Sequence, residues 1–260
     1  MRALEDNFCL KNTACAAAAL RILFVLILAT ATDAALAYRP FDSTDADVVE
    51  PGKFELELGP LGRLREGEKR FVVAPAVVAN YGFSGGREIV LQGRRETALD
   101  REPGETRNAI TDTGLFIKQV LREGALQEKP GASVATEYGF LLPTVNGERG
   151  TGFSVAGIAS QRFEAGTIHL NSALAWTRSH EADLFLGVIL EGPYSRTVRP
   201  VAEVFSEQTS GSPRTDSVLL GAIWRVREDL SLDFGVRDAR AGNVAIHELR
   251  AGLTWNFSTQ

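Results

Sequence analysis

Cysteine and methionine are scarce in this sequence, which has 2 Cys and 1 Met among its 260 residues. Both cysteines, Cys9 and Cys15, lie in the first 37 residues. Residues 38–260 therefore hold no disulfide, thiolate nucleophile or cysteine metal site. With 25 Gly, so little methionine also argues against a helix bundle.

The sequence also lacks a strong excess of either sign of charge. The formal net charge is -5 and no basic run occurs, so we expect no nucleic-acid partner. Hydrophobic residues form 44% of the chain and charged residues 23%, which is ordinary for a folded protein. The sequence therefore predicts a folded chain rather than a disordered one.

No apolar run is long enough to cross a bilayer as a helix. The longest, residues 22–32, follows Arg21 and precedes Ala35-Leu36-Ala37, which is the layout of a secretory signal peptide. We predict cleavage after Ala37. An uncleaved membrane anchor is the alternative, although Arg21 interrupts any longer apolar window. The expected domains are a signal peptide (1–37), a periplasmic N-terminal segment (38–52), a barrel (53–257) and a C-terminal tail (258–260).

The remaining chain alternates between apolar and polar residues, as β-strands do. Leu249, Ala251, Leu253, Trp255 and Phe257 make the clearest apolar face. Twelve such segments are expected, with ten or fourteen strands as alternatives: residues 53–58, 71–80, 87–94, 109–121, 132–142, 152–162, 166–177, 183–190, 198–206, 217–226, 230–237 and 246–257.

Alternation alone does not distinguish a soluble barrel, with its apolar face inside, from an outer-membrane barrel, with that face outside. Twelve strands favour the membrane, because so wide a ring is difficult to fill with side chains. Long polar connections over 59–70, 95–108, 143–151 and 207–216 would all lie at the extracellular end. Aromatic residues expected at the periplasmic end agree with this: Tyr81, Phe83, Phe163, Tyr194, Trp255 and Phe257.

Several short motifs resemble one family of outer-membrane proteins, that of the MetA-pathway of phenol degradation. The similar stretches are residues 39–41, 45–47, 51–57, 80–83, 88–89, 133–137, 142–144 and 251–257. The resemblance implies a barrel channel for small aromatic or other hydrophobic compounds. It carries over no catalytic residue.

Ionisable residues recur on the face assigned to the lumen. They are Glu55, Glu57, Glu88, Arg94, Lys118, Glu137, His169, Arg199, Glu203, Arg225, Asp233, Arg237, Glu248 and Arg250. Such residues either line a pore and select its solutes or pair with one another inside a plugged barrel. Both signs occur, which argues against strong ion selectivity.

Catalysis has weak support. A phospholipase-like hydrolase needs Ser and His together on the lipid-facing side, whereas His169 and Ser172 lie on opposite faces of one strand. A serine from another strand remains an alternative partner. His180 and His247 lack metal-site spacing. We therefore predict no enzymatic activity, metal or cofactor.

The sequence thus predicts an all-β protein, an antiparallel up-and-down transmembrane β-barrel of the bacterial outer membrane with both termini in the periplasm. Its expected function is passive diffusion of small solutes. Expected partners are outer-membrane lipid, a small-molecule solute and the barrel-assembly machinery, with the oligomeric state open. A soluble periplasmic barrel that binds a hydrophobic ligand and an outer-membrane hydrolase are the alternatives.

Overall fold

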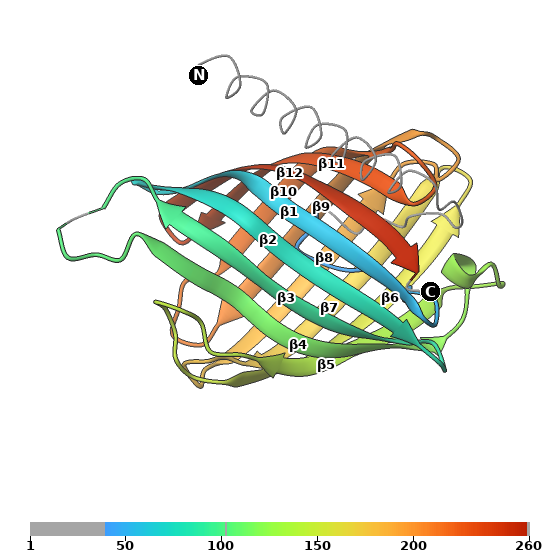
Figure 1. The fold of residues 1–260 in the computed structure, drawn as a ribbon, viewed down its shortest axis with the longest axis horizontal. Coiled ribbons are helices and arrows are strands. Elements are labelled where there is room, and N and C mark those ends of the chain that lie inside the picture. Colours follow the sequence, from blue (N-terminus) through green and yellow to red (C-terminus); the bar gives the residue numbers. More distant parts are fainter. Residues whose placement is uncertain (1–39, 102, 259–260) are drawn as a thin grey trace, which may run out of the picture. The chain divides into compact units, whose positions relative to one another are not determined.

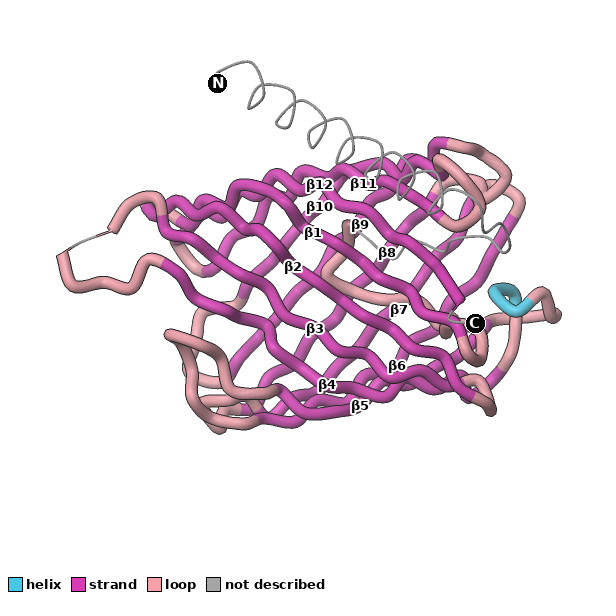
Figure 2. Tube along the Cα trace, in the orientation of Figure 1, coloured by secondary structure: helices cyan, strands magenta, loops and turns pink. Residues whose placement is uncertain are grey.

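The computed structural model describes residues 40–101 and 103–258, so the expected signal peptide with Cys9 and Cys15 lies outside the described residues. Twelve strands and one short 3₁₀ helix make up the fold (Figures 1 and 2). The strands are β1 (Lys53–Glu66), β2 (Lys69–Phe83), β3 (Arg87–Ala98), β4 (Asn108–Arg122), β5 (Ser133–Leu141), β6 (Gly152–Phe163), β7 (Gly166–Trp176), β8 (Ala182–Glu191), β9 (Val198–Thr209), β10 (Thr215–Arg225), β11 (Leu230–Ala241) and β12 (Val244–Ser258), and the helix η1 spans Ala125–Gln127.

Each strand pairs antiparallel with its neighbour in sequence, and β1 pairs with β12 to close the ring. Closure leaves no unpaired sheet edge, which a β-structure needs inside lipid. The predicted twelve-stranded antiparallel barrel is confirmed. No helix in the described ranges is long and apolar enough to span a membrane.

The two ends of the barrel differ. We call the end where β1 begins and β12 finishes the proximal end, and the other the distal end. Four of the distal connections hold five or more residues between strands, at 99–107, 142–151, 177–181 and 210–214. Both ends of the barrel chain, Lys53 and Ser258, lie at the proximal end.

Strands near the barrel closure are longer than the sequence predicts. The polar connection expected over residues 59–70 is wrong, because β1 continues to Glu66 and turns directly into β2 at Lys69. A bulge between Leu58 and Leu61 shifts the register. After it Leu64 is buried while the neighbouring arginines are exposed, so the alternation that marks the first half of β1 changes phase.

The outer face is apolar and the inner face is filled. Leu186 and Leu220 are 51% and 62% exposed, whereas Ile189 and Leu219, on the opposite face of the same two strands, are 0% exposed. A soluble barrel would not present a continuous apolar girdle to water. This orientation therefore fits a barrel surrounded by lipid.

Aromatic rings gather on the outer face at the proximal end. Phe54 packs against Tyr81 and Phe257, and Trp255 packs against Phe257. Tyr194 was expected in the same belt, but it lies among arginine side chains instead. Tyr194 thus lies at the expected end of the barrel, in the turn between β8 and β9, but outside this group of rings.

Leu186→Arg tests the orientation of the barrel. The change should lower the free energy of unfolding by roughly 2–4 kcal/mol, because a charge near the strand centre enters hydrocarbon. Urea titration in lipid vesicles measures it. Ala182→Arg, on the same strand and face but at the distal end, is the matched control, and an equal cost for both variants would contradict a lipid-facing outer surface.

Candidate functional site

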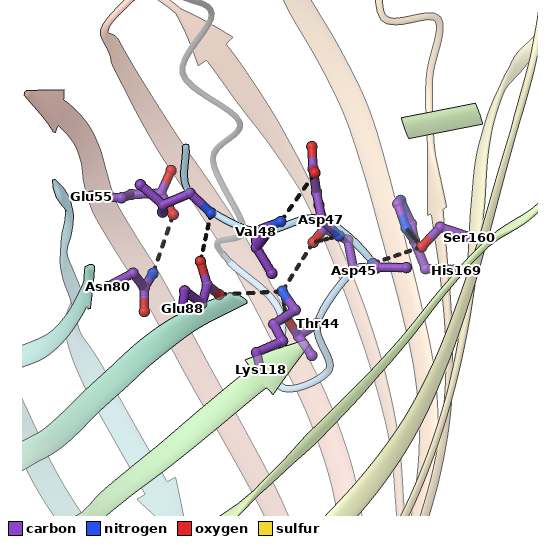
Figure 3. A network of polar contacts seen from close by, with 12 residues as sticks. Thr44, Asp45, Asp47, Val48, Glu55, Asn80, Glu88, Lys118, Ser160 and His169 are labelled. Carbon is purple, nitrogen blue, oxygen red and sulfur yellow. Dashed lines mark hydrogen bonds and ion pairs between the residues drawn. The ribbon is translucent and has the colours of Figure 1, made fainter. Parts of the chain in front are cut away.

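Residues 40–50 run inside the ring of strands, and we call them the plug segment (Figure 3). Hydrogen bonds join them to inward side chains of β3, β4, β6, β7, β9 and β12. The sequence separates residues 38–52 from the barrel as an N-terminal segment and gives no sign of this insertion. The plug segment therefore crosses the lumen and contacts the wall on several sides.

One anchor of the plug segment is a pair of ionisable wall residues, Glu203 and Arg250. The Glu203 carboxylate accepts the backbone N–H groups of Asp42 at 2.9 Å and Ser43 at 2.8 Å. Arg250 donates to the Pro40 carbonyl at 2.7 Å and lies 2.9 Å from the Asp42 carboxylate. Hydrogen bonds to charged groups are worth about 1.5–3 kcal/mol each. These contacts position the start of the segment.

A second anchor lies across the lumen. The Lys118 ammonium is 3.1 Å from the Asp45 carboxylate and 3.7 Å from that of Glu88. Glu88 in turn accepts the Val49 N–H at 2.7 Å. One buried lysine therefore joins two wall strands to the plug segment, as Figure 3 shows.

Neutral side chains hold the middle of the plug segment. Asn171 bonds the backbone of Thr44 twice, since its carbonyl accepts the N–H at 3.1 Å and its amide donates to the C=O at 2.7 Å. The Ser160 hydroxyl accepts the Ala46 N–H at 3.0 Å and bonds His169 at 2.8 Å. These pairs satisfy backbone groups that the segment would otherwise bury without partners.

Three inward glycines make room for the plug segment. A Cβ atom at Gly82 would lie 2.1 Å from the Val49 carbonyl oxygen, one at Gly187 2.3 Å from the Ser43 hydroxyl, and one at Gly235 3.1 Å from the Pro40 ring. Apolar contacts add to the fit, because Phe41 packs against Val201 and Ile223. The wall is therefore shaped to receive this segment.

The fourteen ionisable residues assigned to the lumen face are all buried or half-buried. Ten are buried: Glu55, Glu57, Glu88, Lys118, His169, Arg199, Glu203, Asp233, Glu248 and Arg250. Arg94, Glu137, Arg225 and Arg237 are half-buried.

The lumen residues form several groups. Glu88, Lys118, His169, Glu203 and Arg250 belong to the plug network described above. Elsewhere Arg237 lies 3.4 Å from Glu248, Arg199 lies 3.1 Å from Glu191, and Asn80 donates to Glu55 at 3.2 Å. Arg94 lies 3.5 Å from Asp112 in the distal half. Many of the charges thus pair with one another or with the plug segment.

His169 lies between Ser160 and Glu191 on the inner face. Its Nδ1 is 2.8 Å from the Ser160 hydroxyl, and its Nε2 is 3.6 Å from the Glu191 carboxylate. This order resembles a hydrolytic triad, but the Ser160 oxygen already accepts the Ala46 N–H. His169 is 2% exposed on the inner face, whereas the hydrolase considered above needs it toward lipid. The arrangement therefore supports plug binding rather than hydrolysis.

Two aspartates of the plug segment have pKa values that are shifted in opposite directions. Burial raises the pKa of Asp47 to about 6, and the neighbouring Asp45 adds to the shift. Burial alone would raise the pKa of Asp42 too, but the Arg250 and Arg237 guanidiniums outweigh it and hold that pKa below its ordinary value. Asp42 therefore stays ionised in the docked segment, while Asp47 takes up a proton in mildly acidic solution.

Glu203→Ala tests the first anchor. Removing the carboxylate leaves the Asp42 and Ser43 N–H groups without their partner, so their hydrogen exchange should speed up at least tenfold. Mass spectrometry of the exchanged protein in detergent measures it. Glu207→Ala, two inward positions beyond Glu203 on β9, is the control. Unchanged exchange in Glu203→Ala would contradict the anchor.

No protein-family model matches the chain, and no curated protein sequence matches it. Solved structures resemble it in fold. The COG4313 outer membrane channel from Pseudomonas putida F1 shares 9% identity at a TM-score of 0.60, over 84% of this chain and all 100% of that one. The KdgM porin shares 7% identity at a TM-score of 0.50, over 79% of this chain and 99% of that one. The chain thus has the fold of outer-membrane β-barrel channels.

Proposed function

We propose that this protein is an outer-membrane channel for passive diffusion of small solutes, with the plug segment as the part that narrows its lumen. Residues 1–37 act as the export signal, and both termini of the barrel face the periplasm. Outer-membrane lipid surrounds the apolar girdle, and the barrel-assembly machinery inserts the chain.

The observation that carries this proposal is the inverted distribution of side chains. Apolar residues cover the outside of a closed ring, and ionisable residues line its inside. An interior lined mainly by ionisable groups is what a water-filled path requires, whereas a barrel that stores an apolar ligand has a mainly apolar interior. The fold that the chain shares with two channels agrees with this assignment.

The class of solute is supported by the motif resemblance. The family of the MetA-pathway of phenol degradation implies small aromatic or other hydrophobic compounds. Val201 and Ile223 on the inner face, which Phe41 of the plug segment covers, would offer such compounds an apolar contact when the segment leaves the wall. Ionisable neighbours keep the same path wet.

Deleting residues 40–47 tests the channel. Full-length protein in a planar bilayer should show brief or small conductance steps, and the deleted variant should show larger and longer ones because the wall anchors have lost the segment. Glu203→Ala provides a second variant that keeps the whole chain. If neither variant conducts although both show heat-modifiable gel mobility, the channel assignment is wrong.

The raised pKa of Asp47 predicts that the plug segment docks less tightly as pH rises. The docked carboxyl ionises near pH 6 and the free one near 3.8, so docking gains from the proton at low pH and loses that gain as pH rises through this window. Open time in the bilayer should therefore increase between about pH 4 and pH 6 and level off above that. Asp47→Asn should flatten this increase, and an unchanged slope would contradict it.

A further inference from the structure

Three arginines surround one tyrosine ring near the proximal end of the lumen. The guanidinium carbons of Arg162, Arg199 and Arg225 lie 4.5, 5.2 and 5.4 Å from the centroid of the Tyr194 ring. The arginines come from β6, β9 and β10, and the tyrosine from the turn between β8 and β9. Residues far apart in the sequence therefore meet around a single ring.

All three arginines lie on the inner face of the wall, and Arg162 and Arg199 are closer to the proximal end than the plug anchors Ser160 and Glu203 on the same strands. Arg162 follows Ser160 by two residues on β6, and Arg199 precedes Glu203 by four on β9. Even-numbered spacing keeps each pair on one face of its strand. The cluster therefore lies on the proximal side of the Ser160 and Glu203 anchors.

Positive charge exceeds negative charge in this cluster. Glu191 lies 3.1 Å from Arg199 and 3.6 Å from His169, so Arg199 is already paired. Among the described residues, no carboxylate lies within ion-pair distance of Arg162 or Arg225. The Arg162 Nε is also buried without a hydrogen-bond partner there.

The two arginines without an acidic partner are close together. Their distances to the shared ring place their guanidinium carbons no more than about 10 Å apart. This maximum separation is close to the Debye length of about 8 Å at physiological ionic strength. Salt also screens the repulsion between partly buried charges less than that between exposed ones. The two cations therefore repel each other, and an anion between them would relieve the repulsion.

We propose that Arg162 and Arg225, with Tyr194, form a binding site for the oxyanion of a small solute, either a carboxylate or a phosphate. This inference rests on the proposed channel function and adds a solute class to it. Guanidinium groups bind both oxyanions through paired N–H donors. The Tyr194 ring supports the arginine stems and gives the solute an apolar surface.

The location gives the site a role in permeation. A solute that enters from the proximal opening along β6, β9 and β10 meets the cluster before it reaches the Ser160 and Glu203 anchors of the plug segment. An anionic compound would therefore be concentrated at this opening, and neutral relatives would pass without the same attraction.

Isothermal titration calorimetry on the full-length protein, folded in detergent, tests the site. Sodium benzoate and inorganic phosphate are titrated separately at constant ionic strength, with benzyl alcohol as the neutral analogue of benzoate. We expect saturable binding of at least one oxyanion and at least tenfold weaker binding of benzyl alcohol. Equal binding of benzoate and benzyl alcohol, or no binding of either oxyanion, would overturn the proposal.

The double variant Arg162→Gln with Arg225→Gln assigns the binding to these residues. Its dissociation constant for the oxyanion should rise at least tenfold. Arg240→Gln is the matched control, because Arg240 is an exposed arginine on the outer face of β11. If the control loses as much affinity as the double variant, binding reflects overall charge and the site is wrong.

This experiment is independent of conductance. Oxyanion binding without bilayer steps in any plug variant would leave the site standing and remove the channel. Conductance steps without oxyanion binding would support the channel and rule out the oxyanion site. Heat-modifiable gel mobility checks that each variant has folded before it is titrated.

Discussion

A charged side chain that points into a closed barrel must find a partner, and this requirement organises the whole interior. Lipid around the ring directs apolar residues outward, so ionisable residues collect inside. A buried charge without a partner is strongly destabilising, whereas a buried ion pair contributes little net stability. In this protein a piece of the chain itself meets much of that need, because the backbone N–H groups and aspartates of residues 42–49 lie against Glu203, Arg250, Lys118 and Glu88.

Alternation made the barrel itself predictable. Period-two patterns locate twelve strands, and the apolar residues of β8, β10, β11 and β12 lie on the outer face as expected. Lipid contact imposes this alternation on every strand of the barrel, so a short window of sequence is enough to detect it. The pattern fails at the bulge in β1, where one shift in register moves Leu64 to the inside.

The plug segment was not predictable in the same way. Its anchors join residues that are far apart in the chain, as with Ser43 and Glu203, which are 160 positions apart. No local window contains both partners, and an irregular segment has no periodicity to detect. A partial signal was present in the three inward glycines, Gly82, Gly187 and Gly235, which interrupt strands that would otherwise carry side chains on that face.

The chemistry of the plug contacts suits a segment that leaves and returns. An apolar plug would lose its contacts to water at a cost proportional to its area, so it would stay in place. Ion pairs and hydrogen bonds behave differently, because Asp45, Lys118 and Glu203 recover hydration when the segment moves away and the lumen fills with water. Polar docking therefore specifies where the segment lies, and the hydration that its polar groups regain on leaving offsets part of the docking energy. The proposed channel function requires a well-defined docked position that the segment is able to leave.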